Sequence, residues 1–189
     1  MANFLLNSLQ VSSFSQWKTV FDNASENRIQ NNIVNKGIFQ SVDNENHITV
    51  LSSLPSQKEA QIIIDNLTVQ AAKGELVKKL VDAKVIHDVA FSLTSEVKAG
   101  IITILSHEVK DFDVWLNGFN AGEEMRSKVG IKAVGLFRSN NNPNFVTIIT
   151  EVPSVEVINA FINNPELQAG MEKSGVISKP ELLILKRIS

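Results

Sequence analysis

Two tryptophans and two arginines are the residues of this chain best suited to hold a small molecule. Trp17 precedes Arg28 by eleven residues, and Trp115 precedes Arg126 by the same spacing. Eleven residues make about three helical turns, so each arginine would share a helix face with its tryptophan if the helix continued that far. An indole can border an apolar pocket, and a guanidinium can bind a carboxylate or an enolate. We name these four as candidate ligand-binding residues. The alternative, that the tryptophans pack in the core and the arginines stabilise helix C-termini, stays open.

The sequence gives little support for metal binding or for catalysis by a nucleophilic side chain. The three histidines, His47, His87 and His107, do not have the spacing of metal ligands, and we interpret them as exposed or hydrogen-bonded strand residues. The chain has no cysteine, which excludes disulfides and thiol catalysis, and it has no tyrosine. Glycine-rich phosphate loops and a serine nucleophile elbow are also missing from the sequence. We therefore name no catalytic residue, and we predict no metal and no cofactor.

Composition limits the class of protein. The 189 residues are 43% hydrophobic and 20% charged, which is typical of globular proteins and leaves room for one large domain or two small ones. The net charge of −2 gives no electrostatic indication of nucleic-acid or anionic-membrane binding. No apolar run approaches the roughly 20 residues of a membrane span, and the N-terminus lacks the features of a secretory signal. We expect a cytoplasmic protein.

The chain contains an internal repeat. At an offset of 98 residues, without a gap, residues 11–56 match residues 109–154, and both tryptophans take part in the match. After the second Pro-Ser pair the best offset becomes 91, with Leu76 opposite Leu167. This predicts about seven extra residues in the first copy, two further turns of a helix that would carry Lys78, Lys79 and Lys84 on its solvated face. A repeat this long indicates two copies of a small domain.

Each copy is expected to have the element order βαββαβ. Helices should start at Ser13, Asp111 and the two Pro-Ser pairs, where capping residues precede apolar stripes of helical spacing. Asn164-Pro165 predicts the start of a further short helix. The expected strands are 3–11, 37–42, 47–54 and 85–93 in the first copy, and 100–109, 135–140, 145–152 and 182–188 in the second. The domains would span 1–95 and 99–189, joined by the polar connector 94–99.

The strands also indicate how the copies associate. Ile101–Leu105 and Leu182–Leu185 are almost wholly apolar and do not alternate, so both faces of these strands require cover. Helices cover one face of a βαββαβ sheet, so we expect the two copies to pack sheet to sheet as an intramolecular pseudo-dimer. A monomer with an internal pseudo-twofold axis would then suffice. A further dimer through helix surfaces stays open.

With Gly37-Ile38-Phe39 and Gly135-Leu136-Phe137 following the first helix of each copy, the chain resembles the dimeric α/β-barrel superfamily as a fused tandem version. The fold class is therefore expected to be α+β, two ferredoxin-like units forming one barrel. The superfamily includes antibiotic-biosynthesis-type and haem-degrading monooxygenases. Members that hold haem usually do so through a helix histidine, which the second helices here lack. Cofactor-independent members often position an enolate with tryptophan, asparagine, arginine and tyrosine, of which only tyrosine is absent here.

Three functions follow from these observations. The first is a small-molecule-binding barrel for an apolar or aromatic ligand, with no recognisable catalytic set. The second is a cofactor-independent monooxygenase or isomerase acting on an aromatic or polyketide-like substrate. The third is a protein-interaction module that docks a partner on the lengthened helix, with an exposed apolar patch near Val77 and Val81. An enclosed cavity touching Trp17 or Trp115 would favour the first two.

Overall fold

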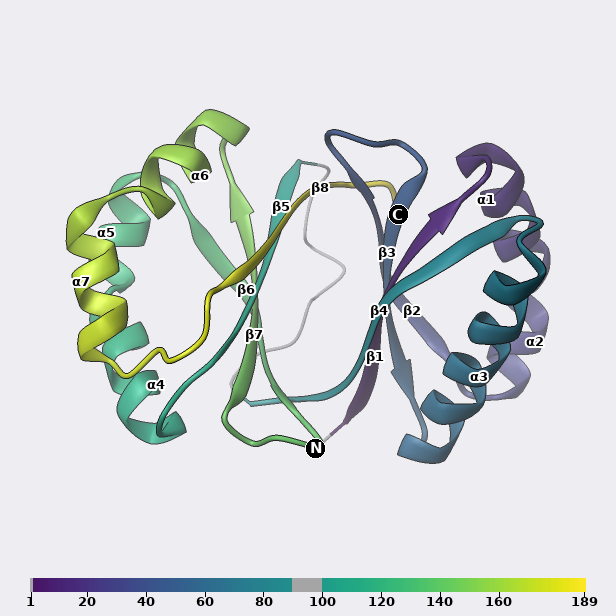
Figure 1. Cartoon of the computed structure of the whole chain (residues 1–189), viewed down its shortest axis with the longest axis horizontal. Helices are drawn as coiled ribbons and strands as arrows, with labels where there is room; N and C mark the ends of the chain where they lie inside the picture. Colours follow the sequence, from purple (N-terminus) through teal and green to yellow (C-terminus); the bar gives the residue numbers. More distant parts are fainter. Residues whose placement is uncertain (1, 90–99) are drawn as a thin grey trace. The chain divides into compact units, whose positions relative to one another are not determined.

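A computed structural model describes residues 2–89 and 100–189. The contacts within it divide the chain into two units, Met1–Asp88 with Lys186–Ser189, and Val89–Leu185. Figure 1 shows that each unit has one sheet with its helices gathered on one face of that sheet. We call them unit 1 and unit 2.

Unit 1 is a four-stranded antiparallel sheet covered by three helices. The strand order is β4-β1-β3-β2, as the residue pairing shows. Its elements are β1 (Asn3–Val11), α1 (Phe14–Asn23), α2 (Ser25–Gln30), β2 (Val34–Ser41), β3 (His47–Leu54), α3 (Gln57–Lys73) and β4 (Val77–Asp88).

Unit 2 has the same architecture with four helices. Its strand order, β8-β5-β7-β6, is that of unit 1. Its elements are β5 (Ile101–Glu108), α4 (Phe112–Ala121), α5 (Glu123–Lys128), β6 (Lys132–Ser139), β7 (Phe145–Val152), α6 (Val155–Ile162), α7 (Pro165–Lys173) and β8 (Glu181–Arg187). The order βαββαβ, with the first helix broken in both units and the second in unit 2, is the predicted ferredoxin-like pattern.

The pairing of the strands repeats at the same 98-residue offset as the sequence. Asn3 lies opposite Leu54 in unit 1, and Ile101 lies opposite Val152 in unit 2. The β2–β3 pairing and the β6–β7 pairing are related in the same way, including a bulge one residue before the glycine in each. The repeated Gly-x-Phe triplet has a packing reason at this bulge. A Cβ atom at Gly37 would lie 2.4 Å from the ring of Phe39, so only glycine leaves room for that ring.

The helices begin where the capping residues predict. Ser13 and Asp111 are the N-caps of α1 and α4, and Ser56 and Ser154 are those of α3 and α6. The Asp111 carboxylate, for example, accepts a hydrogen bond from the Val114 N–H at 2.9 Å, which satisfies one free donor of the first turn. The first helix of each unit does not continue unbroken to the arginine, since α1 ends at Asn23 and α4 at Ala121 before a second short helix begins.

The predicted seven-residue insertion in the first copy is wrong. The Leu76 carbonyl accepts a hydrogen bond from the Ser12 N–H at 2.9 Å, and the Gly175 carbonyl accepts one from the Lys110 N–H at 2.8 Å. Leu76 therefore corresponds to Gly175 and not to Leu167, and the offset at this point is 99. Up to this point the two copies therefore differ by a single residue, with 22 residues in 55–76 and 23 in 153–175.

The error arose because β4 is irregular. Lys78 and Val81 bulge out of the pairing with β1, so the strand loses its period-two alternation and its apolar residues fall at helix-like intervals. The strand begins at Val77 and not at Val85. Accordingly Lys78, Lys79 and Lys84 lie on β4 and not on a helix. The predicted residues 90–93 of this strand and the connector 94–99 lie outside the described residues.

The exposed patch expected near Val77 and Val81 is also wrong. Val77 is 2% exposed and belongs to the core of unit 1, whereas Val81 is 43% exposed as a bulged residue. A single exposed valine is ordinary on a protein surface, so the interaction module loses the feature that distinguished it.

Burial of the strands agrees with their apolar sequences. Ile102 and Thr103 point to opposite faces of β5, and they are 0% and 2% exposed. Both faces of this strand are covered, as the lack of alternation predicts. Among the helices of residues 2–89 and 100–189, none has the length and apolar character that crossing a membrane requires.

Candidate functional site

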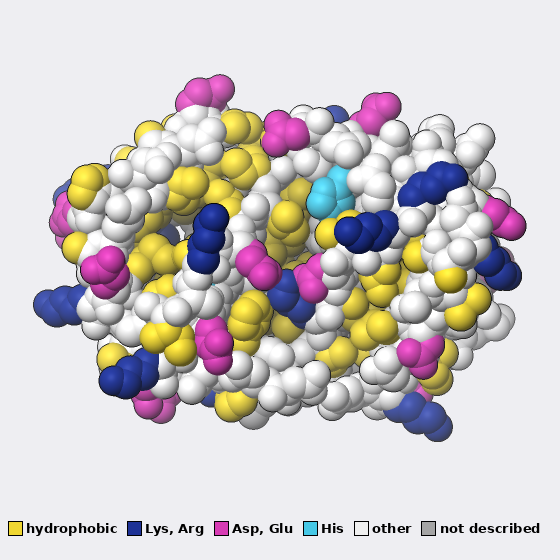
Figure 2. Space-filling model, viewed as in Figure 1, with side chains coloured by type: hydrophobic (Ala, Val, Ile, Leu, Met, Phe, Trp, Pro, Cys, Tyr) yellow, Lys and Arg dark blue, Asp and Glu magenta, His cyan; other side chains and the backbone are white. Residues whose placement is uncertain are grey.

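Unit 2 contains a cavity of about 580 Å³ between its helices and its sheet. Helices α4, α5, α6 and α7 form the walls, and β5 and β7 form the floor. Figure 2 shows hydrophobic side chains gathered around a hollow in the region of α6 and α7. The side chains of the lining that matter most below are Thr103, Leu105, His107, Trp115, Phe119, Met125, Arg126, Thr150, Phe161, Leu167, Gln168 and Met171.

The cavity begins with the break between α6 and α7. Helix α6 ends at Ile162, and the side chain of Asn164 then caps α7 by accepting a hydrogen bond from the Glu166 N–H at 2.8 Å. Pro165 occupies the first position of α7, where its missing N–H leaves no bond unmade. The short helix predicted at Asn164-Pro165 is thus confirmed, and α7 takes its own direction.

The position of α7 is set by its contact with α4. A Cβ atom at Gly118 would lie 2.6 Å from the Cβ of Ser174, so this glycine permits the two helices to approach closely. At the matching position of unit 1 the chain has Val20, which is 57% exposed. Helix α7 can therefore approach α4 closely in unit 2, whereas the valine of α1 does not permit the same approach of α3 in unit 1.

Unit 1 fills the comparable space with side chains. Leu67 and Ala71 of the unbroken α3 pack against the cluster that contains Trp17. Counted back at the offset of 99, these positions correspond to Glu166 and Gly170, which line the cavity. A Cβ atom at Gly170 would meet nothing within 4 Å. The unbroken α3 of unit 1 and the separate α6 and α7 of unit 2 therefore present different side chains to this space.

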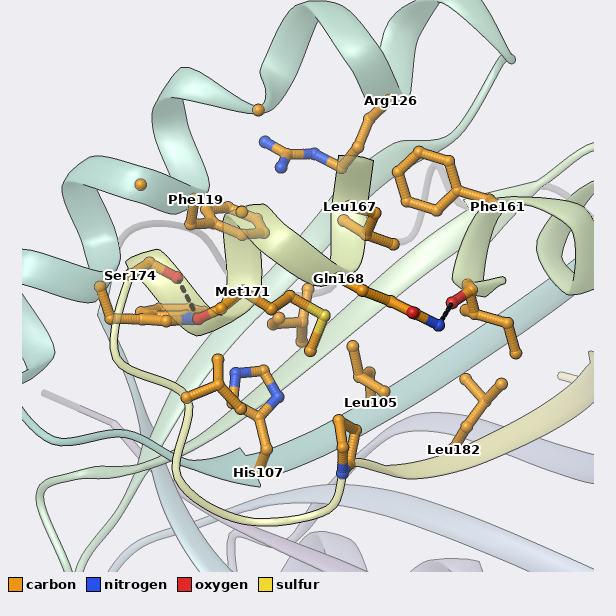
Figure 3. Close-up of a pocket in the computed structure, with 18 of the residues that line it drawn as sticks. Leu105, His107, Phe119, Arg126, Phe161, Leu167, Gln168, Met171, Ser174 and Leu182 are labelled. Atoms are coloured by element: carbon orange, nitrogen blue, oxygen red, sulfur yellow. Dashed lines mark hydrogen bonds between the residues drawn. The ribbon is translucent and has the colours of Figure 1, made fainter. Parts of the chain in front are cut away.

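The floor of the cavity carries both satisfied and unsatisfied polar groups. Thr103 and Thr150 lie on adjacent strands, and their hydroxyls hydrogen-bond each other at 2.6 Å. His107 lies on β5 four residues after Thr103. It is 2% exposed, yet neither ring nitrogen has a hydrogen-bond partner within the described residues. Its ring meets that of Trp115 edge to face, with 5.6 Å between the centroids. Figure 3 shows the imidazole on the floor below Met171.

Burial lowers the pKa of His107 to about 4, so the imidazole is neutral at pH 7. A neutral imidazole has one N–H donor and one nitrogen acceptor, and both are unused here. The interpretation of His107 as an exposed or hydrogen-bonded strand residue is therefore wrong. The sequence does contain one indication that position 107 is buried. At the 98-residue offset His107 lies opposite Leu9, an apolar residue that is 1% exposed in the core.

His47, at the start of β3, is half-buried, and burial lowers its pKa. Its Nε2 is also without a partner within the described residues. Unlike His107 it does not line the cavity. In residues 2–89 and 100–189, no three histidine or acidic side chains gather in a way that would hold a metal ion.

The upper wall is a column of stacked side chains. The ring of Phe119 lies 5.2 Å from that of Trp115, and the guanidinium of Arg126 lies 4.0 Å above the Phe119 ring on its other side. Arg126 is 8% exposed, and its Nη2 forms an ion pair of 3.1 Å with Glu123. Burial lowers the pKa of Arg126 and the Glu123 carboxylate opposes that shift. The Nε of Arg126 has no partner within the described residues.

Unit 1 repeats this column of stacked side chains, and its members do not line the cavity of unit 2. Trp17 stacks on Phe21 at 5.0 Å, and Arg28 lies 3.7 Å above the Phe21 ring while donating to the Phe21 carbonyl. Of the four candidate residues, Trp115 and Arg126 therefore come together at the cavity of unit 2. Trp17 and Arg28 are brought together in unit 1, where they pack against phenylalanine.

No protein-family model matches the sequence, and no curated protein matches it. The structure is similar to solved structures over its whole length. An anthrone oxidase-like protein has 12% identity and a TM-score of 0.59, with 100% of this chain and 92% of that one covered. A protein named "Putative Chlorite dismutase" has 12% identity and a TM-score of 0.65, with 100% of this chain and 94% of that one covered. A ferredoxin fold protein related to antibiotic biosynthesis monooxygenases, from Listeria monocytogenes, has 12% identity and a TM-score of 0.53, covering 100% and 96%.

These likenesses define the fold. The chain has the α+β fold of these structures, with two ferredoxin-like units in one polypeptide. At 12% identity the comparison shows nothing about the reaction or the ligand.

Proposed function

We propose that the cavity of unit 2 binds a small, mainly apolar or aromatic molecule. The observation that carries this proposal is the cavity itself, which has about 580 Å³ of space beneath largely apolar helices. Volumes between roughly 300 and 1,000 Å³ are typical of sites for drug-sized ligands. A well-packed interior leaves few voids larger than a water molecule, so a cavity of this size is a departure that binding would explain.

The lining supports an aromatic ligand. Trp115 and Phe119 offer ring faces and edges on one wall, while Leu167 and Met171 of α7 offer aliphatic surface on another. Arg126 adds a buried positive charge beside Phe119 that favours an electron-rich group such as a carbonyl or enolate oxygen. We assign ligand contact to Trp115 and Arg126, and we assign a packing role to Trp17 and Arg28.

Native mass spectrometry of freshly purified protein tests the proposal. We expect a fraction of the chains to carry one retained small molecule, which the instrument releases on activation. Gly170→Leu is the matched variant, because Gly170 lines the cavity and a Cβ atom there would meet nothing within 4 Å. The wild type should retain the molecule or take up added 2-naphthol, and Gly170→Leu should do neither. The proposal would be contradicted if the wild type showed only the mass of the polypeptide without a bound molecule, both before and after addition of 2-naphthol.

Catalysis stays a prediction from the sequence. Names such as anthrone oxidase-like belong to proteins that share only the fold with this chain. A monooxygenase or isomerase reaction would need a group that moves a proton to or from the bound molecule. Incubation of the protein with anthrone and oxygen decides the question, since unchanged anthrone counts against the reaction.

A further inference from the structure

The polar atoms without partners point toward the cavity's ligand. Among the described residues lining the cavity, the side chains of His107 and Arg126 have buried nitrogens that no protein atom satisfies. Arg126 still has an ion pair with Glu123 and a stacked ring below it. His107 has neither of its two hydrogen bonds, so it is the more unusual residue.

The fold does not need an imidazole at this position. Unit 1 has Leu9 at the equivalent site of β1, in the same register and equally buried. A leucine would avoid the cost of burying an unpaired donor and an unpaired acceptor. Stability alone would therefore favour leucine at position 107, and the histidine is explained by something it binds.

We propose that His107 determines the specificity of the cavity by hydrogen-bonding a hydroxyl or carbonyl group of the bound molecule. This inference rests on the proposed function, because it names the polar group that the ligand presents to the floor of the same cavity. Either ring nitrogen can pair with a hydroxyl, since the N–H donates to its oxygen or the other nitrogen accepts from its O–H, whereas a carbonyl can pair only with the N–H. Thr103 and Thr150 already hydrogen-bond each other through one of their O–H groups, whereas both ring nitrogens of His107 are unpaired within the described residues.

Access to His107 requires a side chain to move. Both ring nitrogens are closed off by their neighbours in the empty cavity. Met171 lies beside the imidazole on the cavity side, with its thioether extending over the floor (Figure 3). An unbranched methionine side chain changes rotamer readily and repacks against an aromatic ligand. Rotation of Met171 would bring a ligand hydroxyl within reach of the ring.

A pair of ligands that differ by one hydroxyl tests the inference. Binding of 2-naphthol and of naphthalene is measured by calorimetric titration for the wild type and for His107→Leu, the residue found at position 9. One neutral hydrogen bond lost corresponds to roughly a threefold to tenfold change in affinity. We expect His107→Leu to weaken 2-naphthol binding about tenfold and to leave naphthalene binding equal or tighter.

Two further variants separate hydrogen bonding from a general effect of the substitution. His107→Gln retains a donor and an acceptor, so it should keep part of the preference for 2-naphthol. His47→Leu makes the same chemical change outside the cavity and should leave both affinities unchanged.

The outcomes distinguish the inference from the proposed function. Tight binding of both ligands with the same 2-naphthol to naphthalene ratio in the wild type and His107→Leu would overturn the role of His107 and leave the binding cavity intact. Failure of the wild type to bind either ligand would overturn both proposals. A change of the ratio in His107→Leu that His107→Gln reverses and His47→Leu does not reproduce would establish His107 as the specificity residue.

Discussion

Replacement of His107 by leucine is predicted to stabilise the protein without ligand. The wild-type ring is 2% exposed and has an unpaired donor and an unpaired acceptor, and each such group costs on the order of 1–3 kcal/mol when buried. Leucine removes both groups and has a precedent at Leu9 in the same register. We therefore expect the free energy of unfolding to rise by at least the cost of one such group, about 1–3 kcal/mol at pH 7. For a chain of this size that raises Tm by roughly 2–10 °C.

The same variant should remove a pH dependence. The pKa of His107 is about 4 in the folded protein and about 6.5 when unfolded, so between these values the unfolded chain binds more protons. Stability contributed by the neutral ring is therefore complete above about pH 6.5 and lost as the pH falls toward 4. The full loss is on the order of 3 kcal/mol, since each tenfold change in proton affinity between the folded and the unfolded state corresponds to about 1.36 kcal/mol. His107→Leu lacks this loss.

Urea denaturation followed by circular dichroism measures both effects. The wild type and His107→Leu are compared at about pH 7.5 and about pH 4.5, and the advantage of the leucine variant should grow at the lower pH by about 2–3 kcal/mol. The comparison between variants cancels the other titrating groups. A leucine variant that is less stable at neutral pH, or whose advantage is the same at both pH values, would refute the account of His107.

Three further predictions concern the cavity and its wall. Gly170→Leu should stabilise α7 by about 1 kcal/mol in thermal unfolding, because a helical glycine is replaced in open space, and it should abolish calorimetric binding of 2-naphthol. Arg126→Met and Arg28→Met should each destabilise the protein by about 1 kcal/mol, because each removes a guanidinium that is stacked on a phenylalanine ring. Only Arg126→Met should change the affinity for 2-naphthol. Equal affinity changes in the two variants would place both arginines or neither at the site. In the Trp17→Phe variant Trp115 is the single tryptophan, and 2-naphthol should quench its emission, whereas the remaining Trp17 of Trp115→Phe should respond little.

The sequence predicted most of the architecture because much of its information is local. His47–Leu54 and Phe145–Val152 are strands with the bounds expected from their turns and β-branched residues. The capping serines mark their helices because the free N–H groups of a first turn need a partner close in sequence. The 98-residue repeat predicted two copies of a small domain with one element order, and the two units share that order.

The errors came from features that depend on partners distant in the chain. The bulges at Lys78 and Val81 follow from the pairing of β4 with β1. They give the apolar residues of β4 a helix-like spacing, so the sequence predicted a helix where the structure has a strand. The cavity depends on the contact of Gly118 with Ser174, which no local pattern reveals. The unusual state of His107 follows from what surrounds it. Only its opposition to Leu9 in the repeat was visible in the sequence.

Methionine methyl resonances offer the most direct test of the cavity as a binding site. The sequence contains three methionines, and two of them, Met125 and Met171, line the cavity. In a sample labelled with ¹³C at the methionine methyl groups, Met125→Leu and Met171→Leu identify these two signals. A molecule in the cavity should shift both, and the shifts should saturate at one 2-naphthol per chain. Unchanged methyl resonances of Met125 and Met171 at saturating 2-naphthol would contradict the account.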